Sequence, residues 1–301
     1  MEFNHQRIVE RHTTATEVIT ENLPIGPLSH LIITLDGWHV AAADYDLAAM
    51  LVWLNNIQVT HHGVGVVDLQ SEDLYGVHAY TQRRLPLLTG RVATDNLHKA
   101  LTLIVPFGRH LMDPAECFPA TKKGELVLRV DTTVPAATFD NSTISIDAVE
   151  LVGATPTRYM KSLRKALAAP GATGEREYEL PTGNPYVCCQ LRMVTVPGAS
   201  SHTYGIDVVK TMVNNKEWGY TAADMMCLQG LRALRIGGPD ATVLALGNSP
   251  LNLIAWIDFD PVDSDEYLLD SAGKDSVKLN LNMGVSEACN LTTMELVAAG
   301  G

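Results

Sequence analysis

Short landmarks in the first half of this chain return in the same order in the second half, and this repetition constrains the fold more than any other feature. The first is Leu-Pro-x-Gly, at Leu23–Gly26 and again at Leu180–Gly183, where each copy opens a long apolar segment rich in turn residues. One further pair matches Tyr45-Asp46, a short apolar helix and Asn55-Asn56 with Ile206-Asp207, a similar helix and Asn214-Asn215. The other pairs are Leu103–Phe107 with Ala255–Phe259, Val127–Val134 with Val277–Val285, and Ser145–Val152 with Asn290–Val297. Landmarks that keep their order over this length predict one structural unit built twice.

Short apolar runs separated by Gly, Pro, Asp or Asn make up most of the first copy. Leu31–Leu35 predicts a strand that ends in a turn at Asp36-Gly37. Further strands are expected at Ile57–Thr60, Val64–Leu69, Leu101–Phe107, Leu126–Val130 and Ile144–Leu151. From Leu126 to Asp131 apolar and polar residues alternate, which is the period of a half-buried strand. Because the sequence has no alternation of strands with long helices, it favours an all-β fold of sandwiches or jelly rolls.

Two segments have the pattern of a helix. Leu47–Leu54 follows Asp46, a good N-cap residue, and contains strong helix formers, so a short buried helix is expected there, ending at Asn55-Asn56. Between Gly153 and Gly171 the pattern is clearer, with the five apolar residues Tyr159, Met160, Leu163, Ala166 and Leu167 on one face. Four basic residues make this helix basic. Membrane-surface or nucleic-acid binding is an alternative use, but we interpret the segment as a linker.

Domain limits follow from the repeat and from the linker. Residues 1–20 are polar and are expected to form an arm outside the first core; the alternatives are a frayed terminus or a helix formed against a partner. Residues 21–153 form the first sandwich, 154–176 the linker helix and loop, and 177–301 the second sandwich.

Composition excludes several classes of protein. The net charge of −12 argues against broad binding of nucleic acid, whose phosphates need a basic face. The N-terminus has no apolar core of a signal peptide, and the sequence has no run of 18 apolar residues, so we expect a soluble chain made in the cytoplasm. The five cysteines, without a CxxC pair, are expected to be small buried residues in a reducing compartment. They are Cys117, Cys188, Cys189, Cys227 and Cys289.

Ten histidines suggest a metal site, but their spacing does not support one. The chain has neither His-x-His nor His-Glu-x-x-His, and the neighbours His61 and His62 should point to opposite faces of a strand. The others are His5, His12, His30, His39, His78, His98, His110 and His202. No G-x-S-x-G and no P-loop occurs either. We therefore expect no enzyme, and no catalytic, cofactor-binding or metal-ligating residues.

Two further features bear on binding. The acidic residues Asp263, Asp265, Glu266 and Asp270 lack the Gly and closing Glu of a calcium loop, so a solvated helix is expected there rather than a cation site. A carbohydrate- or receptor-binding β-sandwich, such as a viral spike or lectin-like module, needs exposed aromatic residues. Aromatic residues are only 6% of the chain. Trp53 and Trp256 lie in apolar runs and should be buried, which leaves Trp38 and Trp218 as candidates for exposed platforms.

Taken together, these landmarks resemble the double jelly-roll major capsid proteins of tailless, membrane-containing icosahedral bacteriophages, with the small corticovirus-type protein nearest in size. The similar features are an extended N-terminal segment running into Leu23–Gly26, an inter-domain helix rich in Arg and Lys at Thr155–Ala169, and the entry to the second domain at Leu180–Tyr186. The last is a final pair of strands around Ile257–Phe259 and Val277–Leu281 that ends at Met294–Val297. The likeness covers about residues 21–298. Long insertions between strands, present in larger members, are absent from this sequence.

This resemblance implies two tandem eight-stranded jelly rolls and a structural role. Such a chain would form homotrimers of pseudo-hexagonal outline that tile an icosahedral virion shell. Its partners would be copies of itself, neighbouring capsomers and penton or minor capsid proteins. The arm at 1–20 would face the internal membrane or another capsomer. Arg7 and Arg11 favour contact with anionic lipid, whereas the acidic residues of the arm favour a capsomer contact.

Overall fold

The computed structural model describes residues 2–13, 16–40, 47–89, 97–133, 138–195, 204–236 and 250–300. Contacts within the chain divide it into two compact units. The first unit contains the chain up to Leu163 and its last residues from Ala298. The second contains the described residues from Arg164 to Val297, apart from Pro250.

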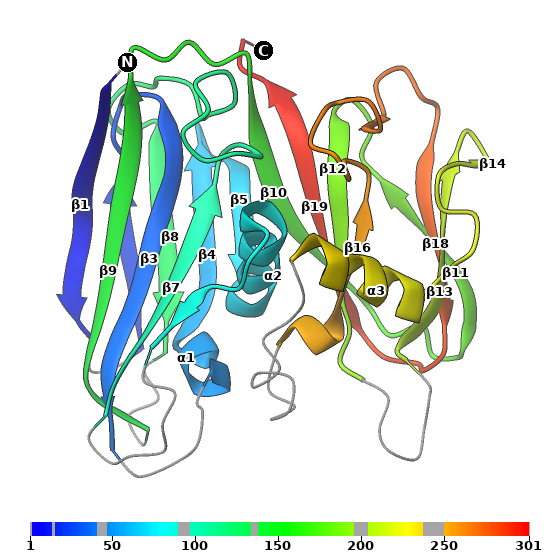
Figure 1. The fold of residues 1–301 in the computed structure, drawn as a ribbon, viewed down its shortest axis with the longest axis horizontal. Helices are drawn as coiled ribbons and strands as arrows, with labels where there is room; N and C mark the ends of the chain where they lie inside the picture. The colour runs from blue at the N-terminus through cyan, green and yellow to red at the C-terminus, as the bar shows by residue number, and fades with distance from the viewer. Residues whose placement is uncertain are drawn as a thin grey trace. The chain divides into compact units, whose positions relative to one another are not determined.

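The first unit is an antiparallel jelly roll of two sheets (Figure 1). One sheet has the order β1-β9-β3-β7-β6, and the other contains β5-β4-β8-β2. The strands are β1 (Glu2–His12), β2 (Glu17–Asn22), β3 (Leu28–His39), β4 (Leu54–His61), β5 (Val64–Gln70), β6 (Leu87–Leu88), β7 (His98–Pro106), β8 (Leu126–Thr132) and β9 (Phe139–Val152). Apart from the two-residue β6, this is the eight-stranded arrangement that the resemblance implied.

Alternation of side chains explains how the central strand β3 forms. Leu31, Ile33 and Leu35 are fully buried, and the residues between them are only half-buried. The turn expected at Asp36-Gly37 is wrong, because β3 continues to His39 while pairing with both β7 and β9. Hydrogen bonding on both sides outweighs the local turn preference of an Asp-Gly pair.

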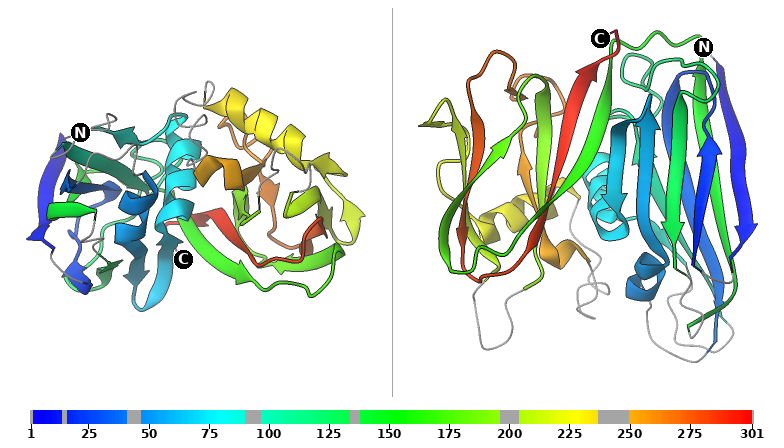
Figure 2. Two further views of the ribbon diagram at one scale, coloured as in Figure 1. Left: turned by 90° about the horizontal axis from the view of Figure 1, so that it is seen from below. Right: turned by 180° about the vertical axis from the view of Figure 1, so that it is seen from behind.

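The second unit repeats this arrangement (Figure 2). Its sheets have the orders β16-β12-β19-β10 and β11-β18-β13-β14, with β17 beside β12 and β15 beside β13. The strands are β10 (Arg158–Leu167), whose residues up to Leu163 belong to the first unit, β11 (Gly174–Leu180), β12 (Pro185–Arg192), β13 (Ile206–Val213), β14 (Lys216–Glu217), β15 (Ala223–Asp224), β16 (Ile254–Asp258), β17 (Leu269–Asp270), β18 (Val277–Met283) and β19 (Cys289–Ala298). The short 3-10 helix η1 (Pro250–Leu253) precedes β16.

Most of the repeated landmarks lie at equivalent places in the two units. Leu23–Gly26 connects β2 to β3, and Leu180–Gly183 connects β11 to β12. The pair that ends at Phe107 and Phe259 places β7 with β16. The pair that begins at Val127 and Val277 places β8 with β18, and the last pair places β9 with β19. Each member of a pair lies beside the corresponding strands of its own sheet, except that β7 also pairs with β6.

One landmark pair is not equivalent. The segment that begins at Ile206-Asp207 is strand β13 and not a helix, whereas the helix of its supposed counterpart is α1 (Leu47–Trp53). Tyr45-Asp46 itself lies outside the described residues. Similarly, Asn55-Asn56 belongs to β4, but Asn214-Asn215 forms the turn that follows β13. The sheet pairing matches β13 with β4 instead. β4 pairs with β8, which pairs with β2, and β13 pairs with β18, which pairs with β11. β2 and β11 are the second strands of their units.

The helix expected between Gly153 and Gly171 is wrong, because this segment is strand β10. Met160 and Ser162 are buried on one face while Lys161 is half-buried, which is the alternation of a strand. Ser162 and Leu163 pair in parallel with Val67 and Asp68 of β5. The backbone hydrogen bonds supplied by neighbouring strands therefore override a helical pattern in the local sequence.

The expected N-terminal arm is also a strand. Residues 2–12 form β1, which pairs along its length with β9 and buries Val9. In the sheet orders β1 lies next to β9, just as β10 lies next to β19. The segments interpreted as arm and linker are thus the same element of the repeat, namely the first strand of each jelly roll.

The short helix expected at Leu47–Leu54 is confirmed as α1. Two other helices were not anticipated, namely α2 (Ser71–Gln82) and α3 (Met225–Arg235). The sequence of α2 gives little amphipathic signal, because buried positions include the polar residues Asp73 and His78. Its location between β5 and β6 becomes visible only in the fold.

Candidate functional site

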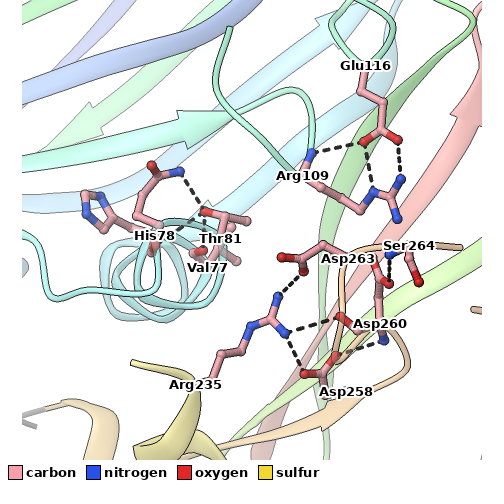
Figure 3. A network of polar contacts seen from close by, with 11 residues as sticks. Val77, His78, Thr81, Arg109, Glu116, Arg235, Asp258, Asp260, Asp263 and Ser264 are labelled. Carbon is pink, nitrogen blue, oxygen red and sulfur yellow. Dashed lines mark hydrogen bonds and ion pairs between the residues drawn. The ribbon is translucent and has the colours of Figure 1, made fainter. Parts of the chain in front are cut away.

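A buried cluster of charges holds the long loop between β7 and β8 in the first unit (Figure 3). Glu116, in this loop, is almost fully buried and accepts a hydrogen bond from Arg109 Nε at 2.9 Å and another from Arg109 Nη2. Arg158, the first residue of β10, donates from Nε to the same carboxylate at 2.8 Å. Glu116 also forms a parallel bridge with Arg158. The cluster thus fastens the loop to the start of β10.

The charge of Glu116 is maintained by its partners. Burial alone would raise the pKa of this carboxyl, but the hydrogen bonds and positive charges of Arg109 and Arg158 outweigh it, so the pKa lies below the ordinary value. Gly108 lets the loop close over the cluster, because a Cβ at that position would lie 2.0 Å from the backbone oxygen of Glu116. Sequence reasoning did not identify these residues, since nothing in their spacing marks them as partners.

A second buried cluster holds the corresponding loop of the second unit, after β16 (Figure 3). Arg235, at the end of α3, contacts Asp258 at 2.8 Å and Asp263 at 2.7 Å. It also donates a hydrogen bond to the backbone oxygen of Asp260 at 3.3 Å. The guanidinium therefore connects α3 to the end of β16 and to the loop beyond it.

This arrangement corrects the interpretation of the acidic residues 263–270. They form turns and the two-residue strand β17 rather than a solvated helix. Asp263 and Asp265 have positive φ angles of 53° and 58°, which a helix does not allow. Asp263 is bound by Arg235, so its role is to anchor the loop.

Buried histidines form another group of titratable residues. Desolvation by burial lowers the pKa of His30 to about 4 and that of His78 to about 4. His78, on α2, accepts a hydrogen bond at Nδ1 from the backbone N–H of Ile104 in β7, which fixes the helix to the sheet. His78 also lines an open hollow of about 400 Å³ with Arg84, Leu87 and Leu111.

His78 should make the first unit sensitive to acid. Its folded pKa of about 4 lies below the ordinary value of 6.5, so the unfolded state binds more protons between these limits. The contribution of His78 to the free energy of unfolding is therefore fully present above pH 6.5. It is lost as pH falls toward 4, by up to about 1.4 kcal/mol per pH unit. Urea unfolding from pH 7 to 4 should give a shallower pH slope for His78→Gln. An unchanged slope would contradict this assignment.

His61 and His62 do not point to opposite faces, contrary to the expectation from sequence. His61 ends β4, and His62 has a φ of 50° in the turn before β5, which brings the two ring centroids to 4.3 Å. The side chain of Glu125, just before β8, lies 3.8 Å from His62 Nε2. These three residues form one cluster at the end of the first unit's sheet.

Exposed aromatic residues are placed as the sequence suggested. Trp53 and Trp256 are buried, whereas Trp38 and Trp218 are partly exposed. Trp218 lines a hollow of about 300 Å³ in the second unit together with Tyr220, Tyr267 and Glu266. Aromatic faces beside a carboxylate can contact a sugar ring and its hydroxyl groups, so this hollow is where the lectin-like alternative has structural support.

The cysteines are free thiols, and four of the five are buried. Burial raises the pKa of Cys117 to about 11 and places that of Cys188 well above its ordinary value, which keeps both thiols protonated and unreactive. Within the described residues, the helices are too short or too polar to cross a membrane.

Comparison with known proteins agrees with this architecture. No model of a protein family matches the sequence, and no curated protein matches it. The fold is similar to the major capsid protein of Sulfolobus Turreted Icosahedral Virus, with a TM-score of 0.72 and 14% identity over 99% of this chain and 97% of that one. It is similar to the major capsid protein of bacteriophage PM2, with a TM-score of 0.64 and 14% identity over 100% of both chains. A capsid protein of PBCV-1 virus gives a TM-score of 0.61 and 9% identity over 98% of this chain and 93% of that one. The chain therefore has the double jelly-roll fold seen in these viral capsid proteins.

Proposed function

We propose that this chain is a major capsid protein, the structural subunit of an icosahedral virion shell. The observation that carries the proposal is the succession of two eight-stranded jelly rolls, which accounts for the whole described chain and matches the capsid proteins named above over nearly their full length. The best-defined polar clusters, around Glu116 and Arg235, each fasten a loop within one compact unit, as expected of a rigid building block.

We further propose that three copies form a capsomer of pseudo-hexagonal outline. Three chains with two similar domains each present six similar domains, and closed symmetry then allows tiling of a shell. The surface of α3 fits burial against another copy, because Met226, Leu231 and Leu234 are 66%, 51% and 80% exposed. Apolar side chains grouped on one exposed element are typical of a contact surface.

The first strand is a second candidate contact. β1 is the edge of its sheet and exposes Phe3, so a neighbouring capsomer could cover it. Contact with anionic lipid has less support. Arg7 is bound to Asp147 and Glu10, and Arg11 lies 3.3 Å from Glu21, so acidic residues of the chain already neutralise these charges.

Finer assignments are also proposals. The chain would be located in the virion after synthesis in the host cytoplasm, with penton or minor capsid proteins as further partners. A corticovirus-like origin rests on the sequence landmarks, and similar folds occur in capsid proteins of other viruses. We propose domains with main bodies at 21–153 and 177–301, to which 1–20 and 154–176 contribute the strands β1 and β10.

Sedimentation of the purified full-length chain tests the proposal. We expect a homotrimer, and electron microscopy of virions should show density for two jelly rolls per chain tiling the shell. A stable monomer that binds a glycan array, with binding lost in Trp218→Ala, would instead favour the carbohydrate-binding alternative. That variant is chosen because Trp218 lines the aromatic hollow of the second unit.

A further inference from the structure

Three potential metal ligands converge where the turn between β4 and β5 meets the start of β8. One ligand atom from each of His61, His62 and Glu125 lies within 4.8 Å of the other two. Ligands around a tetrahedral zinc ion lie about 3.4 Å apart, given bond lengths near 2.0–2.1 Å. The side chain of His62 is 60% exposed, so its ring can move this small distance without disturbing the core.

The surroundings orient two of the three ligands. The backbone N–H of Lys122 donates to Glu125 Oε2 at 2.7 Å, which leaves Oε1 directed at His62. Such a hydrogen bond to a ligating carboxylate is the usual support for a metal site. The ring of His61 packs edge-on against the buried Phe118, with centroids 5.4 Å apart.

The chemistry of the three side chains also suits a metal ion. Two imidazoles and one carboxylate are a ligand set that zinc accepts, with water in the fourth position.

We propose that His61, His62 and Glu125 bind a divalent transition metal ion, with zinc as the expected ion. The site would join the β4–β5 turn to the segment that leads into β8, where the backbone N–H of His62 already donates to the backbone oxygen of Glu125 at 3.0 Å. The bound ion would stabilise the folded first unit, because the unfolded chain does not hold the three ligands together.

The test is titration of the untagged full-length chain, stripped with a chelator, with Zn²⁺ by calorimetry and with Co²⁺ by visible absorption. We expect one ion per chain and a higher melting temperature in Zn²⁺. His62→Gln should weaken binding at least tenfold and abolish the Zn²⁺-dependent rise in melting temperature. Glu125→Gln is a second variant that can still accept the hydrogen bond from Lys122.

The matched control is His98→Gln. His98 is exposed, belongs to the first unit and lies 2.6 Å from Asp36, so it also pairs a histidine with a carboxylate. Binding equal to that of the unaltered chain in this variant supports the proposal. No stoichiometric binding by the unaltered chain, or full binding by both His62→Gln and Glu125→Gln, would overturn it. If His62→Gln unfolds without metal, the Glu125→Gln result decides.

Discussion

Replacing Glu116 by Gln is expected to destabilise the first unit by about 3–5 kcal/mol, which is the usual effect of removing one partner from a buried charge pair. The carboxylate serves two guanidinium groups, with Arg109 Nε at 2.9 Å and Arg158 Nε at 2.8 Å. An amide removes the negative charge and offers one acceptor oxygen instead of two, so two buried or half-buried cations lose their compensation.

Urea unfolding at pH 7 measures this effect. Glu10→Gln is the control, because Glu10 pairs with Arg7 at an exposed position, where a pair contributes less than about 1 kcal/mol. The difference between Glu116→Gln and the unaltered chain should shrink in acid. The folded pKa of Glu116 is lowered, so its contribution is present above the ordinary pKa and is lost as pH falls through the folded value. A loss at pH 7 equal to that of the control would refute the role of the cluster.

Phe107→Ala and Phe259→Ala should each cost about 3–5 kcal/mol, as expected for removing a buried phenyl ring. Phe107 follows β7 and Phe259 follows β16, and both are buried. Phe107 packs near Phe118, with ring centroids 5.6 Å apart, and Phe259 packs near Trp218 at 5.8 Å. Each residue also donates its backbone N–H to the strand beside it. Phe107 donates to the backbone oxygen of Ser29 at 3.0 Å, and Phe259 donates to that of Val187 at 2.9 Å.

The two substitutions, Phe107→Ala and Phe259→Ala, therefore test whether the two units are copies of one plan. The two residues occupy equivalent places in different units, so each variant should lower the unfolding midpoint of its own unit, followed by tryptophan fluorescence and proteolysis. Phe107→Leu and Phe259→Leu are the controls and should cost less, because they remove less volume. A large loss at one position and almost none at the other would argue that the two sites are not equivalent.

Part of this fold could be predicted from the sequence because strands that are buried on one face have a local signature. The alternation in Leu126–Asp131 identified β8, and the two Leu-Pro-x-Gly segments marked the same connection in both units. The landmark pairs that end at Phe107 and Phe259 likewise proved equivalent. Apolar periodicity and turn chemistry are properties of neighbouring residues, so they can be read along the chain.

Other features depend on neighbours that are distant in sequence. The sequence predicted an arm at β1 and a helix at β10, because their polar residues have no clear strand period. Pairing with β9, β5 and β19 makes them strands. The contacts of Glu116 with Arg158 and of His62 with Glu125 likewise form only because folding brings distant residues together. The sequence by itself determined a duplicated β-fold, because burial patterns are local. Only the tertiary structure decided the edge strands, the charge clusters and the proposed metal site, because hydrogen bonds and ion pairs join residues that the chain brings together on folding.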